Sequence, residues 1–176
     1  MNVKNAIVQG ENYRFTVLTP SMIRMEYSEK GVFVDKKTQM VVNRTFDVPE
    51  YTVNEKNGEL IIETDKARLV RFAGNNLRIE QRNQKVIYES TWHYGDTGHN
   101  LKGTTRTLDQ ANGEIPLQDG LFSMEGWAVI SDKGSMLLTE DGWIERREDI
   151  DAEDLYYFGY GTDYLGCLKD YYKLTG

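Results

Sequence analysis

Polar and hydrophobic residues alternate along several short segments in the first half of the chain. Tyr13, Phe15 and Val17 alternate with Arg14 and Thr16, and a period of two predicts a strand with one buried face and one solvent-facing face. The same alternation predicts further strands at residues 22–27, 60–64, 69–72 and 77–82. No helical pattern separates these segments, so their spacing favours an antiparallel β-sandwich or barrel over βαβ units.

Turn signals and a second group of apolar segments extend this pattern. Asn57-Gly58 predicts a type I′ hairpin, because both residues tolerate a positive φ. Strand patterns resume at residues 127–130, and Lys133-Gly134 predicts a turn after them. Residues 136–138 are expected to pair back on this strand as a hairpin, followed by Trp143 and Ile144. Residues 145–154 are strongly charged, and we interpret them as a solvated edge.

Two longer segments lack this alternation. Residues 28–48 are irregular, with a charged, turn-like Asp35-Lys36-Lys37. Residues 91–126 are rich in glycine and show few alternations. A loop this long within a compact domain is usually functional or disordered, and the many apolar and aromatic residues in this one argue against disorder. We therefore expect an ordered loop excursion at residues 91–126.

The pattern changes to helical spacing at the C-terminal end of the sequence. Leu165, Leu168 and Tyr172 lie at i, i+3 and i+7, which predicts a helix from Tyr164 with an apolar stripe. Asp163 is the expected N-cap. A helix of about 12 residues is only marginally stable alone, so this stripe needs a partner, and we interpret the helix as a hinge into a further part of the protein.

Composition limits the classes of partner. The chain has 176 residues and a formal charge of −7, which argues against nucleic acid, since phosphate binding requires clustered Lys and Arg. No apolar run is long enough for a membrane span, and the first residues lack the h-region of a signal peptide. The single cysteine, Cys167, suits a reducing cytoplasm. No metal or cofactor is expected, because His93 and His99 lack the further ligands of a zinc set.

Candidate binding residues are concentrated in the loop excursion. Charged groups that make hydrogen bonds, beside aromatic rings, are residue types that bind polar ligands. The candidate binding residues are Arg106, Asp109, Asp119 and Glu125. The alternative is that the two aspartates bond their own backbone in turns, and that the tryptophans bordering the loop belong to the core.

Four stretches of the sequence, in order, carry a resemblance to a known family. They are residues Gly31–Gln39, Gly103–Asp109, Gly120–Ile130 with Leu137–Trp143 after it, and Phe158–Gly176. Together they resemble glycoside hydrolase family 31, the α-glucosidase and α-xylosidase group, in which an N-terminal β-sandwich leads into a catalytic (β/α)8 barrel. The sequence departs from the family pattern at Met124-Glu125, where Arg-Asp is more usual.

The resemblance implies a division of the chain and of its function. Residues 1–161 would form an all-β, antiparallel β-sandwich of the galactose-mutarotase-like supersandwich type, and residues 162–176 would start the linker helix to an absent barrel. The two carboxylates of a retaining α-glycosidase would lie on that barrel, so no catalytic residue is assigned here. The chain alone would be inactive; it would pack on the barrel and lend a loop to the pocket for an α-linked glucoside or xyloside.

Other functions stay open at this point. The chain could be a stand-alone carbohydrate-binding module or an acidic interaction domain without a sugar ligand. The terminal helix favours a domain of an enzyme, because a free-standing module has no need of an unpartnered apolar stripe. The expected partners are the glycoside substrate and the barrel, and formation of a homo-oligomer is left open. Residues 28–48 either reach toward the barrel or form an ordinary surface connection.

Overall fold

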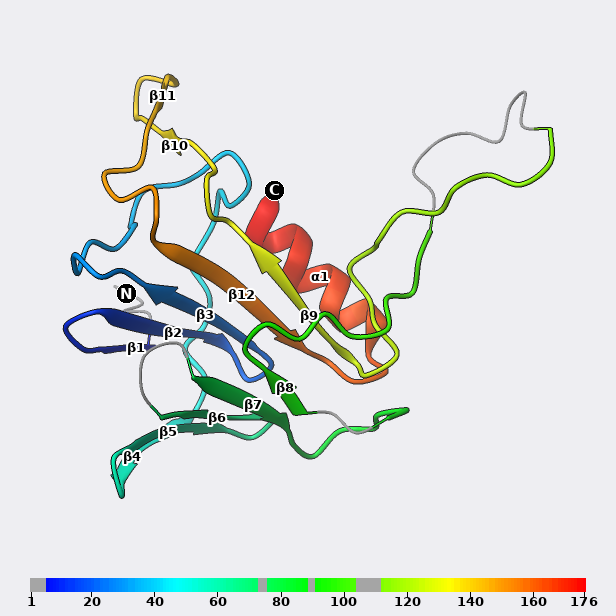
Figure 1. Cartoon of the computed structure of the whole chain (residues 1–176), viewed down its shortest axis with the longest axis horizontal. Coiled ribbons are helices and arrows are strands. Elements are labelled where there is room, and N and C mark those ends of the chain that lie inside the picture. Colours follow the sequence, from blue (N-terminus) through cyan, green and yellow to red (C-terminus); the bar gives the residue numbers. More distant parts are fainter. Residues whose placement is uncertain (1–5, 73–75, 89–90, 104–111) are drawn as a thin grey trace.

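The computed structural model describes residues 6–72, 76–88, 91–103 and 112–176. These residues form two five-stranded sheets, a two-stranded hairpin and one helix (Figure 1). The first sheet has the order β1-β2-β3-β12-β9, with bounds Ala6–Gln9, Tyr13–Thr19, Met22–Tyr27, Glu153–Gly159 and Trp127–Ser131. The second has the order β4-β5-β6-β7-β8, with bounds Tyr51–Lys56, Glu59–Thr64, Ala67–Arg71, Leu77–Gln81 and Thr91–His93. The hairpin pairs β10 (Leu137–Leu138) with β11 (Ile144–Glu145), and α1 spans Tyr164–Thr175. The expected pairing of residues 136–138 with the strand at 127–130 is therefore wrong, because β9 pairs with β12 instead.

The two sheets pack face to face over a common hydrophobic core. All of their strand pairs are antiparallel. Val17 of β2, Ile62 of β5 and Ile79 of β7 are at most 1% exposed and belong to one cluster. These residues come from alternate positions of their strands, which is how a sandwich fills the space between its layers. The prediction of an all-β antiparallel sandwich is therefore confirmed.

The sequence predicted one hairpin turn correctly and missed one strand. Asn57 and Gly58 join β4 to β5 with φ angles of 54° and 80°, as a type I′ turn requires. Strand β8 lies at the start of the stretch that we expected to be loop, so that expectation is wrong for residues 91–93. Trp92 of β8 is 1% exposed and pairs opposite Ile79, which places it in the core.

The outer face of the first sheet is also covered. We call residues 31–47 the strap; together with α1, it packs over this face and forms a second apolar cluster that includes Val41, Phe46 and Leu174. Under the strap, Arg14 of β2 and Arg24 of β3 are only 5% and 2% exposed. The expected solvent-facing side of β2 is therefore wrong, because the strap removes it from water.

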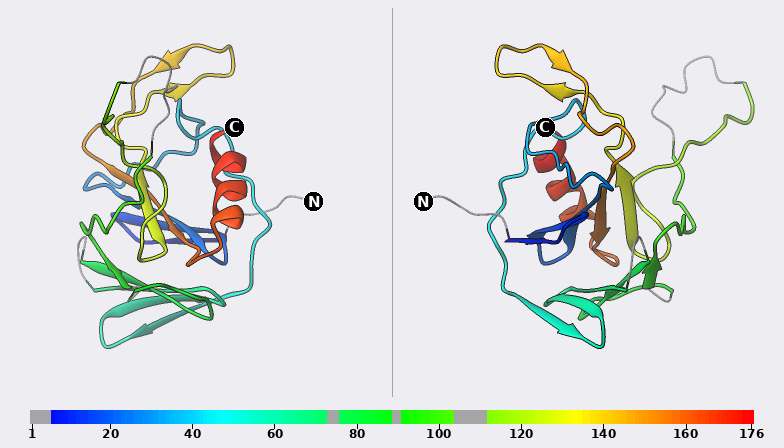
Figure 2. Two further views of the ribbon diagram at one scale, coloured as in Figure 1. Left: turned by 90° about the vertical axis from the view of Figure 1, so that its right-hand side faces the viewer. Right: turned by 60° about the vertical axis from the view of Figure 1, so that its left-hand side comes forward.

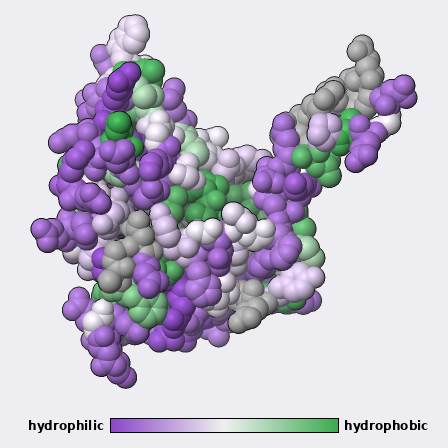
Figure 3. Space-filling model, in the orientation of Figure 1, coloured by the Kyte–Doolittle hydropathy of each residue, from purple (hydrophilic) through white to green (hydrophobic). Residues whose placement is uncertain are grey.

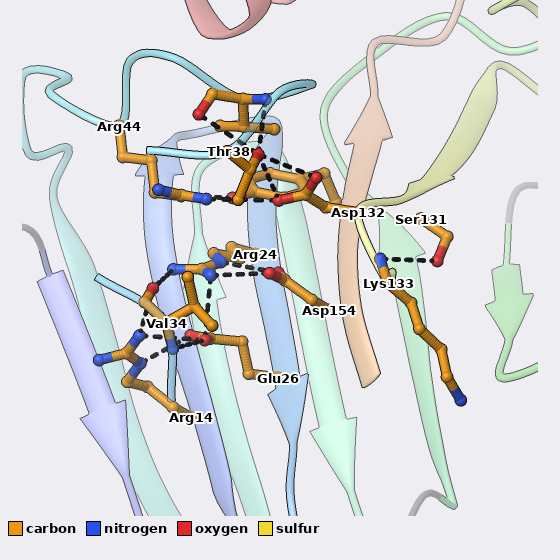
Figure 4. A network of polar contacts seen from close by, with 12 residues as sticks. Arg14, Arg24, Glu26, Val34, Thr38, Arg44, Ser131, Asp132, Lys133 and Asp154 are labelled. Carbon is orange, nitrogen blue, oxygen red and sulfur yellow. Dashed lines mark hydrogen bonds and ion pairs between the residues drawn. The ribbon is translucent and has the colours of Figure 1, made fainter. Parts of the chain in front are cut away.

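A buried ionic network fills the space between the strap and this sheet (Figure 4). The Arg14 side chain pairs with Glu26 at 2.6 Å, and the Arg24 side chain pairs with Asp154 at 2.8 Å. Both arginines also donate to the Val34 carbonyl oxygen of the strap, at 3.0 and 2.8 Å. Arginine forks that serve a carboxylate and a carbonyl oxygen together fix the strap in register with the sheet.

The network continues into the charged segment before β12. Arg147 is 6% exposed and pairs with Asp132 and Asp154, each at 2.9 Å. The interpretation of residues 145–154 as a solvated edge is therefore wrong for Arg147 and for Asp149, which is 5% exposed. Burial alone would raise the pKa of Asp154, but its pairing with Arg24 and Arg147 outweighs burial and lowers the pKa.

The strap also fixes the end of α1. The main-chain N–H groups of Val42 and Asn43 both donate to the Leu174 carbonyl oxygen at 3.1 Å, and the Asn43 side chain donates to the Lys173 carbonyl oxygen at 2.9 Å. The last carbonyl groups of a helix have no partner within the helix, so these bonds satisfy them. The strap thus links the buried network to the helix.

Helix α1 has one packed face and one exposed face. Asp163 caps its N-terminus by accepting a bond from the Gly166 N–H at 3.0 Å, which confirms the predicted cap. Cys167 and Leu174 face the sheet and are at most 4% exposed, whereas Leu165 and Tyr172 are 80% and 61% exposed. Part of the predicted apolar stripe therefore faces away from the sandwich. In the part of the chain that the structure describes, no helix is long and apolar enough to cross a membrane.

Candidate functional site

A projecting segment between β8 and β9, which we call the arm, spans residues 97–126. Its two sides are bonded to each other near the sandwich: the Leu101 N–H donates to the Phe122 carbonyl oxygen at 2.8 Å, and the Met124 N–H donates to the His99 carbonyl oxygen at 2.9 Å. Gly103 and Gln118 exchange two further main-chain bonds. The described outer residues of the arm, 101–103 and 112–119, stand clear of both sheets (Figures 1 and 2). An ordered excursion, as the sequence predicted, is thus present in the described part.

The outer part of the arm is solvent-exposed and carries both polar and apolar residues (Figure 3). Leu101 and Leu117 are 40% and 52% exposed. Asp119 has a side chain that is 73% exposed, and its carboxylate lies 3.7 Å from the Lys102 ammonium group. An exposed pair of this kind contributes about 0–1 kcal/mol to stability. Asp119 is therefore available to a ligand at little cost to the fold.

The four predicted substrate-binding residues fall in different places. Arg106 and Asp109 lie outside the described residues. Asp119 is on the exposed side of the arm, whereas Glu125 is at its base and is only 9% exposed. The Gln81 side chain of β7 donates to the Glu125 carbonyl oxygen at 2.9 Å, which holds this base against the second sheet. No shared site of Asp119 and Glu125 is formed among the described contacts.

Both carboxylate oxygens of Glu125 contact one residue, His99. The His99 main-chain N–H donates to Oε2 at 2.9 Å, and the His99 ring atom Nδ1 lies 2.5 Å from Oε1. Burial alone would raise the pKa of Glu125, but the hydrogen bonds from the ring and main chain of His99 outweigh burial and lower the pKa. The Glu125 carboxylate is thus charged, and both of its oxygen atoms are engaged by His99.

The ring of His99 is presented to solvent. Its side chain is 80% exposed, and the Tyr88 ring, itself half exposed, lies 6.4 Å away between centroids. Gly98, the residue before His99, has a φ of +65°, and a Cβ there would lie 3.0 Å from the Glu125 carboxylate. Sequence reasoning missed His99 and Tyr88, because 26 residues separate His99 from Glu125 and no motif joins them.

A groove of about 550 Å³ extends from β9 along the arm to Asp119. Asp96, Asn100, Asp119 and Glu153 contribute polar groups to its lining, and Tyr94 contributes a partly exposed ring. Trp127 also lines the groove but is only 5% exposed, so its ring belongs mainly to the core. The groove has space and hydrogen-bonding groups for a small polar ligand.

Two other chemistries receive no support from the described residues. Burial raises the pKa of the Cys167 thiol to about 12, so this sulfur is protonated and packed rather than nucleophilic. Across the described ranges, no group of three or more His, Cys, Asp or Glu residues could hold a metal ion.

Comparisons with known proteins bear on the fold alone. No family model and no curated protein matches the sequence. Two solved structures that resemble the chain are a variant of a Flavobacterium johnsoniae GH31 dextranase complexed with isomaltotriose and the same dextranase complexed with glucose. Each matches with a TM-score of 0.54 and 16% identity, over 98% of this chain and 28% of the dextranase. The chain therefore has the fold of about a quarter of that enzyme's length.

Proposed function

We propose that this chain is a non-catalytic domain of a glycoside hydrolase related to family 31. The observation that supports this most directly is the fold match, which takes in 98% of the chain but 28% of a dextranase. The four ordered sequence stretches that resemble the family are independent support. In this proposal the α-linked substrate, a glucoside or xyloside, is hydrolysed by a retaining mechanism on a separate (β/α)8 barrel.

Two surfaces suit the contacts that this proposal requires. The exposed face of α1, with Leu165 and Tyr172, offers apolar area for packing on a barrel. The arm stands away from the sandwich and carries Asp119 and exposed leucines. An arm with little to bury on its own domain is suited to enter a neighbouring pocket. The arm would then complete the substrate site.

A second candidate function is a carbohydrate-binding module. The groove beside β9 favours it, because the groove combines a tyrosine ring with carboxylate and amide groups, as sugar sites do. A module of this kind would bind a saccharide without any barrel. The two functions therefore differ in what the chain does alone and in what it does as part of a longer protein.

The test compares the whole protein with this chain, using aryl α-glucosides, aryl α-xylosides and isomaltotriose. We expect turnover by the whole protein and none by the chain. Turnover by the chain that a single Asp or Glu substitution abolishes would contradict the non-catalytic role. An inactive whole protein, together with saccharide binding by the chain, would favour the binding module instead.

A further inference from the structure

His99 and Glu125 form a polar pair at the base of the arm. The two contacts between them have different consequences. The bond from the His99 main-chain N–H to Glu125 Oε2 joins the two sides of the arm. The contact between His99 Nδ1 and Glu125 Oε1 instead orients a ring that is 80% exposed.

The contact between the His99 ring and Glu125 adds little to the stability of the fold. An imidazole that is 80% exposed buries little apolar area. The main-chain bonds between the two sides of the arm, with the bond from Gln81 to the Glu125 carbonyl oxygen, already anchor the arm. The contact with the ring does, however, determine which face of the imidazole is free. A carboxylate that holds Nδ1–H selects the tautomer in which Nε2 is an acceptor, and with Nδ1 engaged, Nε2 is the ring nitrogen left for a ligand.

We propose that His99 contacts the substrate, with Nε2 accepting a hydrogen bond from a sugar hydroxyl. This inference rests on the proposed function and names a contact within it. Glu125, predicted from sequence to bind substrate itself, is then a positioning residue that orients the ring of His99. Tyr88, whose ring lies 6.4 Å away and is half exposed, offers an apolar face beside the same sugar.

The chemistry of the pair favours a neutral, hydroxyl-rich ligand. The carboxylate of Glu125 lies directly behind the ring, so an anion would meet a negative charge. An imidazole nitrogen that accepts a hydrogen bond, beside an exposed aromatic ring, matches a pyranose, which offers hydroxyl donors at its rim and C–H groups on its faces.

Two substitutions separate orientation of the ring from anchoring of the arm. His99→Asn keeps the main-chain N–H and places an amide donor where Nδ1 is, so Glu125 stays satisfied, but it removes the Nε2 acceptor. Glu125→Gln keeps the size of the side chain, yet its amide NH₂ must face either the main-chain N–H or Nδ1. In the second case the ring adopts the tautomer with Nε2–H and loses its acceptor.

His93→Asn is the matched control. His93 is a second exposed histidine, at the end of β8, and its Nδ1 lies 3.3 Å from an Asp96 carboxylate oxygen. Both histidines therefore have a ring oriented by a carboxylate, but only His99 lies on the arm. A general effect of losing an exposed imidazole would appear in both variants.

The measurement is kcat/KM of the whole protein with isomaltotriose and an aryl α-glucoside, beside the unfolding free energy of each variant. We expect His99→Asn and Glu125→Gln to lower kcat/KM about tenfold, with His99→Asn as stable as wild type and His93→Asn unchanged. Long-range ¹H–¹⁵N spectra should show the Nδ1–H tautomer of His99 in the wild type and its loss in Glu125→Gln.

Two results would overturn the inference, and they are distinguishable. If the whole protein is active and His99→Asn has wild-type kinetics, His99 does not contact the substrate. The proposed function would still hold in that case. If the wild-type protein is inactive on every α-glycoside tested, both the proposed function and this contact are contradicted.

Discussion

The strap and the arm are both long, irregular segments attached to the same sandwich, yet their polar groups are used differently. In the strap, the Val34 carbonyl oxygen accepts from two buried arginines, and the N–H groups of Val42 and Asn43 cap α1. In the arm, the outer part holds an exposed carboxylate at Asp119 and exposed leucines at 101 and 117. An irregular segment whose polar groups are paired with the fold serves the fold. One whose outer part keeps polar and apolar groups exposed is free to serve a ligand.

The largest expected difference between the two regions is in stability. Asp154→Asn removes a buried carboxylate that two buried arginines, Arg24 and Arg147, share. Breaking a buried pair in this way costs about 3–5 kcal/mol, and urea denaturation should show a loss of this size. Asp119→Asn on the arm breaks only an exposed pair with Lys102 and should change the unfolding free energy by less than about 1 kcal/mol. Equal losses would contradict the distinction between the two segments.

The two faces of α1 should differ almost as much. Leu174 is fully buried under the strap, so Leu174→Ala should lower the unfolding free energy by about 2–5 kcal/mol. Leu165 is 80% exposed, and Leu165→Ala should change it by about 0.5 kcal/mol or less. Thermal denaturation of the isolated chain measures both. A large loss at Leu165 would show that its face is already packed, on the sandwich or on a second copy.

The buried network also gives the sandwich a defined response to acid. The pKa of Asp154 is lowered in the folded chain, so its contribution is fully present above its ordinary unfolded value of about 4 and is lost as pH falls through the folded value. The stability difference between wild type and Asp154→Asn should therefore be constant near neutral pH and shrink below about pH 4. A difference that stays constant down to pH 2 would exclude Asp154 from the acid response.

These contrasts show why the sequence predicted the sandwich better than its surfaces. Alternation of Phe15 and Val17 with polar neighbours reflects a period that any sheet imposes, and Asn57-Gly58 carries its turn within two residues. The same alternation predicted that Arg14 faces solvent. This was wrong because the strap covers Arg14, and the residues around Arg14 carry no sign of the strap. Arg147, in a run of charges, was misread for the same reason.

The candidate site was less accessible to sequence reasoning than the fold. Glycines and carboxylates identified the arm as unusual, and the resemblance to family 31 gave it a role. The contact between His99 and Glu125 depends on how the two sides of the arm meet, 26 residues apart, which no local pattern encodes. Arg106 and Asp109 stay predictions.

The central claim is that the arm serves the substrate rather than the stability of its own domain. Its most direct test replaces residues 104–117 with Asn-Gly, a two-residue turn that closes the arm on the hydrogen-bonded pair Gly103 and Gln118. We expect kcat/KM of the whole protein for isomaltotriose to fall at least tenfold, or about 1.4 kcal/mol of transition-state binding, while the unfolding free energy of the chain changes by less than about 1 kcal/mol. Unchanged kinetics with a destabilised chain would contradict the claim and leave the arm as scaffold.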